Sequence, residues 1–213
     1  MAIQNTLPDP LSPIDSQGNA NLGLYGPGFA SLTVESVQPV LTNKSRSGIS
    51  FRQINMYHEW NVSVKYNPLT KAQFNTVYGF LLKHQATLEP FLVGLPQHYK
   101  PSVTDKEITA TAEAGSTTLT VSNTTGVEVG DMFYVADPGD DTHVKAYQVT
   151  TVPNSTSITI SPALQKKVVG NTSADAVFAY PKIQVLADSD TISYSIDSNG
   201  LYNLSLKLKE SLV

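Results

Sequence analysis

The chain has 213 residues, which is enough for one large domain or two small ones with an ample hydrophobic core. Its 14 basic residues are outnumbered by 18 acidic ones, so sequence-independent binding to nucleic acid or to an anionic membrane surface is disfavoured. There is no cysteine, which excludes disulfides and thiolate metal sites.

Proline, glycine and asparagine dominate residues 1–29. This stretch contains no apolar run, so we expect neither a signal peptide nor a membrane span here. No Gly-Lys-Ser/Thr follows its glycines, which excludes a phosphate loop. We interpret residues 1–29 as an N-terminal arm that acts as a linker. The alternative is an arm that packs on a neighbouring subunit through its apolar side chains, which are Leu22, Leu24, Tyr25 and Phe29.

Alternating apolar and polar residues predict two strands after this arm. Leu32 and Val34 alternate with polar neighbours, and Ile49 and Phe51 do so after a polar turn at residues 42–48. A third strand follows, in which Trp60, Val62, Val64 and Tyr66 share one face. These alternations indicate half-buried β-sheet.

The period then changes to that of a helix, which we predict over residues 70–86. Thr70 and Gln73 have the spacing of a capping box, and Lys83 and His84 place positive charge near the helix end. One apolar stripe is expected to face the sheet; it comprises Phe74, Val77, Tyr78, Leu81 and Leu82. We interpret Trp60, Phe74 and Leu81 as core anchors, because each lies on the predicted apolar face of its element.

The remainder of the chain contains strand patterns and no further helical stripe. Residues 91–95 predict a short buried strand between prolines, and residues 107–178 hold short, evenly spaced strands typical of a small all-β barrel or sandwich. Residues 183–208 predict a closing hairpin that joins the sheet of Trp60. We therefore expect a mainly β fold with one major α-helix, a split β-barrel or sandwich formed by residues 30–106 and 179–213, and an inserted small all-β domain at 107–178.

The sequence contains few candidates for catalytic or metal-binding residues. His58, His84, His98 and His143 lack the spacings of metal ligands; His84 is interpreted as a cation at the helix end, and the others as surface or partly packed rings. The acidic turn of Asp137, Asp140 and Asp141 lacks the calcium-loop pattern and is interpreted as a solvated loop. We expect no catalytic residue, no cofactor and no metal, and therefore no enzyme.

Several motifs resemble a known family. They are Ser45-Arg46-Ser47-Gly48, Arg52, Trp60-x-Val62-x-Val64-x-Tyr66, Leu69-Thr70-x-x-Gln73-Phe74, Phe80-Leu81-Leu82, Phe91-Leu92, Val129-Gly130-Asp131-Met132-Phe133 and Leu204-x-Leu206-x-Leu208-x-Glu210. They are similar to the tail-hub (minor tail) proteins of long-tailed, siphovirus-type bacteriophages, and most of all to the distal tail protein type. The resemblance covers residues 30–213 and has no counterpart for the N-terminal arm.

This resemblance implies a structural role in the virion. A homo-hexameric ring would connect the tail tube to the tail tip or baseplate, with sheets of adjacent chains lining a channel through which DNA passes without specific binding. The partners would be copies of the chain, the tail tube protein and the hub or tip proteins, with no membrane; the chain would be made in the host cytoplasm. Arg46 and Arg52, beside the flexible Gly48 loop, would contact an acidic residue of a neighbour or line the channel mouth.

Three alternatives remain at this stage. The first is a host-surface carbohydrate-binding tail module that uses the 107–178 insertion, although most of its aromatic residues alternate into a core (Phe133, Tyr134, Tyr147, Phe178 and Tyr180). The second is a tube-end or other minor tail protein of the same fold. The third, a tail-borne peptidase or glycosidase, lacks any recognisable group of catalytic residues.

Overall fold

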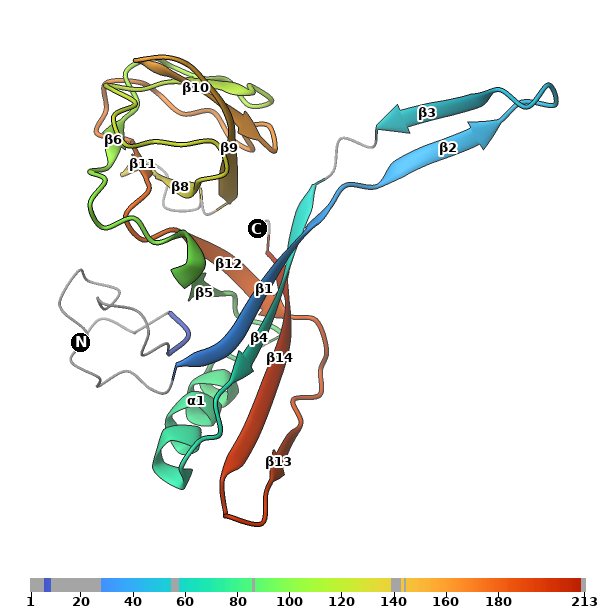
Figure 1. Ribbon diagram of the computed structural model, residues 1–213, viewed down its shortest axis with the longest axis vertical. Coiled ribbons are helices and arrows are strands. Elements are labelled where there is room, and N and C mark those ends of the chain that lie inside the picture. The colour runs from blue at the N-terminus through green and yellow to red at the C-terminus, as the bar shows by residue number, and fades with distance from the viewer. Residues whose placement is uncertain are drawn as a thin grey trace.

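The computed structural model describes residues 6–8, 28–54, 58–85, 87–138, 143 and 145–211. The protein is mainly β, with a single α-helix in these residues and curled antiparallel sheets (Figure 1). This confirms the coarse fold class predicted from the sequence. Leu22, Leu24, Tyr25, Asp140 and Asp141 lie outside the described residues.

The first sheet brings together strands from both ends of the chain. Its order is β1 (Phe29–Val37), β4 (Glu59–Tyr66), β14 (Tyr202–Glu210), β12 (Lys182–Ala187) and β5 (Phe91–Gly94), and β13 (Tyr194–Ile196) pairs with β14. Every pairing is antiparallel. The predicted closing hairpin therefore does join the strand that carries Trp60, through the register of Leu208 with Val62.

The helix α1 (Lys71–Lys83) covers one face of this sheet (Figure 1). It begins where the sequence predicted, because the Thr70 side chain accepts from the Gln73 amide while the Gln73 side chain accepts from the Thr70 amide at 2.9 Å. Its buried residues are Phe74, Val77 and Leu81, which join the core formed by the apolar face of β4. The capping box and the core positions of Phe74 and Leu81 are confirmed.

One expectation at the end of α1 is wrong. Leu82 is 59% exposed rather than part of the stripe. At 3.6 residues per turn it lies roughly 80° around the helix from Phe74, which takes it off the face that meets the sheet. His84 caps the end of α1, where it is 4% exposed, packs against the rings of Phe80 and Phe91, and places its Nδ1 3.6 Å from Glu89 Oε2.

The second sheet is formed by residues 106–177. Its order is β6 (Lys106–Glu107), β11 (Asp175–Val177), β8 (Met132–Ala136), β9 (Ala146–Asn154), β10 (Ser157–Ser161) and β7 (Thr118–Thr120). It encloses its own apolar core, which includes Phe133, Tyr147 and Phe178. Met132 and Ala146 belong instead to the core of the first sheet, so the two sheets are packed against each other. A short 3-10 helix, η1 (Pro96–His98), follows β5.

Part of the N-terminal arm packs on the chain's own body. Leu7 is 1% exposed, and its amide donates to the Leu92 carbonyl at 2.8 Å beside β5. The hydroxyl of Tyr66 donates to the Pro8 carbonyl at 3.0 Å. Phe29 is buried and its ring packs edge-on against Tyr66, so it serves the internal core rather than a neighbouring subunit.

Candidate functional site

The most exposed part of the fold is a two-stranded hairpin of residues 40–54, called here the projecting hairpin. It consists of β2 (Val40–Lys44) and β3 (Ser50–Ile54), which pair only with each other. All five residues of β2 are exposed, and Figure 1 shows the hairpin reaching away from the rest of the molecule. An isolated two-stranded ribbon is marginally stable in water, so this segment is expected to gain most of its stability from a partner.

A break in strand pairing separates this hairpin from the first sheet. The β1–β4 ladder ends with Val37 opposite Glu59, and pairing resumes with Val40 opposite Ile54. Pro39 lies in the gap and has no backbone N–H for a ladder hydrogen bond. In the sequence two residues separate Val37 from Val40 and four separate Ile54 from Glu59, so the two ladders are out of register and the hairpin pairs separately from the sheet.

A hydrogen-bonded turn from Ser45 to Ile49 closes the tip of the projecting hairpin. The Ser45 amide donates to the Ile49 carbonyl at 2.8 Å, and the Gly48 amide donates to the Ser45 carbonyl at 3.0 Å. Gly48 has φ +84°, in the left-handed region, although an added Cβ would meet nothing within 4 Å. The glycine is therefore required by the backbone and not by crowding. Arg46 lies in this turn and Arg52 on β3, so the structure places all three predicted site residues on the projecting hairpin.

The hairpin has two chemically different faces. Opposite residues in an antiparallel pair point to the same side, and side chains alternate along each strand. Leu41 pairs with Gln53 and Asn43 with Phe51, which forms an apolar and amide face. Thr42 pairs with Arg52 and Lys44 with Ser50, which forms a basic face. Leu41 and Phe51 are 63% and 61% exposed, which is unusual for large apolar side chains unless a partner covers them.

At the root of the hairpin the two sheets are joined by a buried ion pair. Lys145 Nζ lies 2.6 Å from Glu210 Oε2, with side-chain exposures of 4% and 0%. The same carboxylate accepts from the Trp60 amide at 3.1 Å, and the Trp60 indole N–H donates to the Ala146 carbonyl at 2.9 Å. Burial raises the pKa of Glu210, and the Lys145 ammonium and the Trp60 amide oppose that rise. Trp60 is thus a core anchor that also connects the sheets.

His58 extends this junction toward the hairpin. Its carbonyl accepts from Lys145 Nζ at 3.2 Å, its ring packs edge-on against Trp60, and its Nε2 lies 3.0 Å from the Ser36 hydroxyl at the end of β1. Burial, with the nearby Lys145 charge, lowers the pKa of His58 to about 4. His58 is therefore neutral at physiological pH and acts as a packing group.

One feature of the sequence indicated that a charged residue is buried at this junction between the sheets. Glu210 has the same parity as Leu204, Leu206 and Leu208, so strand alternation alone places a carboxylate on the buried face of β14. A buried carboxylate requires a cation or hydrogen-bond donors. The partner, Lys145, follows the acidic turn in an unpatterned stretch, and no local pattern indicates it.

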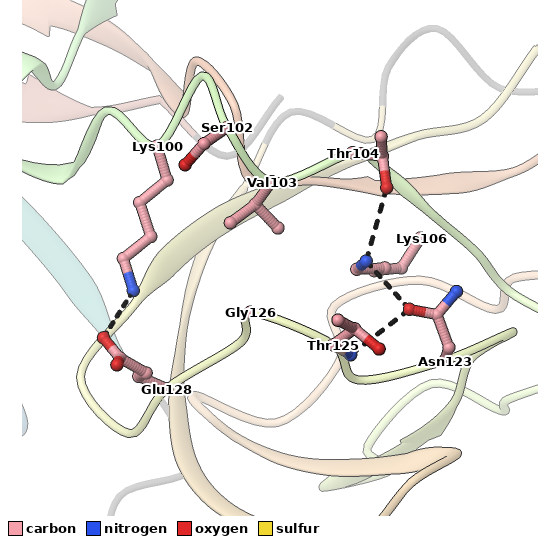
Figure 2. Close-up of a pocket in the computed structure, with 9 residues that line it drawn as sticks. All are labelled: Lys100, Ser102, Val103, Thr104, Lys106, Asn123, Thr125, Gly126 and Glu128. Atoms are coloured by element: carbon pink, nitrogen blue, oxygen red, sulfur yellow. Dashed lines mark hydrogen bonds and ion pairs between the residues drawn. The ribbon is translucent and has the colours of Figure 1, made fainter.

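The second sheet carries a polar cavity of about 610 Å³ (Figure 2). Lys106, which is 2% exposed, donates to Asn123 Oδ1 at 2.9 Å and to Thr104 Oγ1 at 3.4 Å. At the other side Lys100 Nζ lies 2.8 Å from Glu128 Oε2, and this contact lowers the pKa of Glu128. Hydroxyl, amide and charged groups of this kind can bind a polar ligand, but none of the described residues that line the cavity has an aromatic ring for sugar stacking.

The remaining candidates are placed as follows. His143 is 2% exposed and its Nε2 lies 2.8 Å from the Tyr147 hydroxyl, so its interpretation as a surface or partly packed ring is wrong. Phe133, Tyr147 and Phe178 are buried, as their alternation predicted. Among the described residues, no three His, Asp or Glu side chains are grouped as a metal ion would require. No helix in that part of the chain has the length and apolar character that crossing a membrane requires.

No protein-family model matches the chain, and no curated protein matches it either.

Proposed function

We propose that the protein is a structural component of a phage tail. Six copies form a ring that connects the tail tube to the tail tip or baseplate and leaves a channel for DNA. The observation that carries this proposal is the projecting hairpin, which has exposed apolar side chains, open edges and no partner strand among the described residues. The motif resemblance to distal tail proteins, a split β fold with one covering helix, supports the same role.

A projecting element on one side of a subunit is suited to ring closure. If the hairpin of each subunit binds a different surface on the next subunit, the contact is heterologous, and a suitable rotation closes it into a ring. Closure also covers the open strand edges, which would otherwise promote aggregation. In this proposal the hairpin is the contact that holds the ring together.

The sheet face opposite α1 is the surface that we assign to the channel. On β4 and β14 this face carries small polar residues and lysines, among them Ser63, Lys65, Ser205 and Lys207. Lys209 on the same face is paired with Glu59 at 3.1 Å, which neutralises part of the charge. A polar surface without aromatic stacking groups is compatible with passage of DNA without specific binding.

Electron microscopy and mass measurement test the ring. The purified chain should form particles of six times the chain mass of 23.0 kDa, with a central channel visible in projection images. Arg46→Glu should weaken this assembly, because it reverses the charge at the hairpin tip without touching the core. The matched control is Lys167→Glu, a side chain 53% exposed on the second sheet. Unaltered assembly of Arg46→Glu would show that the hairpin tip is not part of the interface. A monomeric wild-type chain would contradict the ring.

A second candidate function is binding of host-surface carbohydrate through residues 107–178. The polar cavity around Lys106 and Asn123 is the observation that favours it. Cell-wall fragments should then bind to the wild-type chain and bind at least about fivefold more weakly to Asn123→Ala, since loss of a hydrogen-bonding group that contacts the ligand costs on the order of 1–3 kcal/mol. Equal binding by both chains would exclude this cavity as the binding site.

A further inference from the structure

Every charged side chain of the projecting hairpin is basic. Residues 40–54 contain Lys44, Arg46 and Arg52 and no Asp or Glu. None of these three cations forms an ion pair with a carboxylate in the described part of the chain. Beside them lie the exposed apolar side chains of Leu41, Ile49 and Phe51. A partner surface should therefore be acidic and apolar, and it should offer a strand edge to a hairpin whose own edges are open.

One surface of the same chain has these properties. Residues 187–201 contain Asp188, Asp190 and Asp197 and no Lys or Arg. Two cations of the neighbouring strand β14 lie beside Asp188: Lys207, whose carbonyl accepts from the Asp188 amide at 2.9 Å, and Lys209, which is already paired with Glu59. Three acids against one lysine unpaired among the described residues leave this region with a net negative charge. Between these acids lies β13, with Tyr194 46% and Ile196 55% exposed. These five residues are called here the β13 surface.

The β13 surface is open on one side. Strand β13 pairs with β14 and with no other described strand, so its outer edge has free backbone groups. Tyr194 packs against Phe74, with ring centroids 4.7 Å apart, and this aromatic backing holds its exposed side in place. Asp188 and Asp190 are exposed and form no ion pair with a described cation. Asp197 is partly buried and caps its own turn by accepting from the Asn199 amide at 2.8 Å.

Other exposed apolar residues match the hairpin less well. Leu82 and Leu88 lie beside one cation and one acid, Lys83 and Glu89, so that region has no net negative charge. Val169 follows two lysines, and the acid beside them, Glu113, is already paired with Lys167 at 2.7 Å. The acids near Val129 are already engaged, because Lys100 binds both of them. Complementary charge and an open edge occur together only at the β13 surface among these regions.

We propose that the projecting hairpin of one copy binds the β13 surface of a second copy, with Leu41 and Phe51 against Tyr194 and Ile196, and with the hairpin cations facing Asp188 and Asp190. The hairpin tip and β13 lie at opposite ends of the molecule, so a chain cannot make this contact with itself (Figure 1). Two different surfaces that lie far apart give a head-to-tail contact, which is the arrangement that a ring requires. The inference rests on the proposed function and names the receiving surface within it.

Charge-swap complementation tests the pairing. One variant carries Arg46→Glu and Arg52→Glu, and the other carries Asp188→Lys and Asp190→Lys. All four side chains are exposed, so both variants should fold, and circular dichroism checks this. Each variant alone should associate at least about tenfold more weakly than the wild type in sedimentation velocity, with a strong salt dependence. In an equal mixture every contact has opposite charges again, so association should return. The control variant Glu113→Lys, on the second sheet, should behave as wild type.

Cysteine cross-linking distinguishes failure of this inference from failure of the ring. Because the chain has no cysteine, Ser50→Cys on one copy and Ser195→Cys on another are the only thiols in a mixture. Ser50 adjoins Phe51 and Ser195 lies between Tyr194 and Ile196, so a short bismaleimide should join them, and it should not join Ser50→Cys to a control Thr172→Cys. Cross-linked pairs without rings would support the hairpin–β13 contact and overturn the ring. Rings with unimpaired Asp188→Lys/Asp190→Lys assembly, or with no such cross-link, would overturn the contact and leave the ring standing.

Discussion

The buried ion pair between the two sheets makes the sharpest quantitative prediction. Lys145→Met removes the ammonium and leaves the Glu210 carboxylate fully buried, with only backbone amides, those of Trp60 at 3.1 Å and of Ala146, as donors among the described residues. Removal of one partner of a buried pair destabilises proteins by about 3–5 kcal/mol, because the other charge stays out of water uncompensated. With a denaturant slope of about 2–3 kcal/mol/M, the urea midpoint should fall by about 1–2 M.

The loss of stability in Lys145→Met should be larger at high pH than at low pH. Burial already raises the pKa of Glu210, and removal of Lys145 removes the main charge that opposes the rise. The folded variant then takes up a proton that the unfolded chain releases, so its deficit relative to wild type should be largest near pH 8 and smaller near pH 5. Trp60 is the only tryptophan, and its fluorescence reports directly on this junction.

Two controls make the result decisive. Lys167→Met breaks an exposed pair with Glu113 at 2.7 Å and should change stability by less than about 1 kcal/mol. The double variant Lys145→Met/Glu210→Leu removes both charges and should recover most of the loss. A change below about 1 kcal/mol for Lys145→Met at both pH values would refute the reasoning, since it would mean that the pair behaves like a surface pair.

Single substitutions test three further local features. Thr70→Ala removes the helix cap and should lower stability by about 1 kcal/mol in urea unfolding. The folded state keeps His58 neutral down to about pH 4, whereas the unfolded chain protonates it near pH 6.5. The free energy of unfolding should therefore decrease as the pH falls from about 6.5 to about 4, and this decrease should be smaller in His58→Gln. Gly94→Ala should lower the melting temperature, because its Cβ would overlap the Tyr99 hydroxyl; Gly79→Ala, with open space, should raise it.

Each of these has a contradicting result. Unchanged stability in Thr70→Ala would mean that tertiary packing alone sets the start of α1. An unchanged acid slope in His58→Gln would assign the slope to other groups, such as His98, whose pKa burial also lowers. Equal melting temperatures for Gly94→Ala and wild type would show that the Tyr99 ring can move aside.

The elements set by local chemistry were predictable from the sequence. The strand of Trp60, the Thr70 cap and the stripe through Phe74 depend on residues within a few positions of each other, and the structure confirms them. The strands of residues 107–178 were predicted for the same reason, although β6 consists of Lys106 and Glu107, which pair with β11, and Ile108 forms only an isolated bridge with Val121. These strands and the helix cap can be predicted from the sequence because the interactions that form them join residues close together in the chain.

What the sequence did not indicate depends on residues far apart in the chain. Leu7 becomes a core residue because it lies beside Leu92, and nothing near Leu7 predicts that. Lys145 is buried because Glu210 of another sheet needs a cation. Strand β2 also extends to Lys44, into the polar turn predicted at residues 42–48, since cross-strand pairing of Asn43 with Phe51 overrides weak local propensity.

The junction and the projecting hairpin are mechanically connected. Lys145 donates both to Glu210 of the first sheet and to the carbonyl of His58, the described residue at which the chain returns from the hairpin. The second sheet therefore cannot rotate against the first without losing a bond at the hairpin root. In the proposed ring, a hairpin held by the neighbouring copy would fix the direction in which the 107–178 insertion points. The buried pair would then be retained for orientation rather than for stability, because a well-packed apolar pair of similar volume is often as stable.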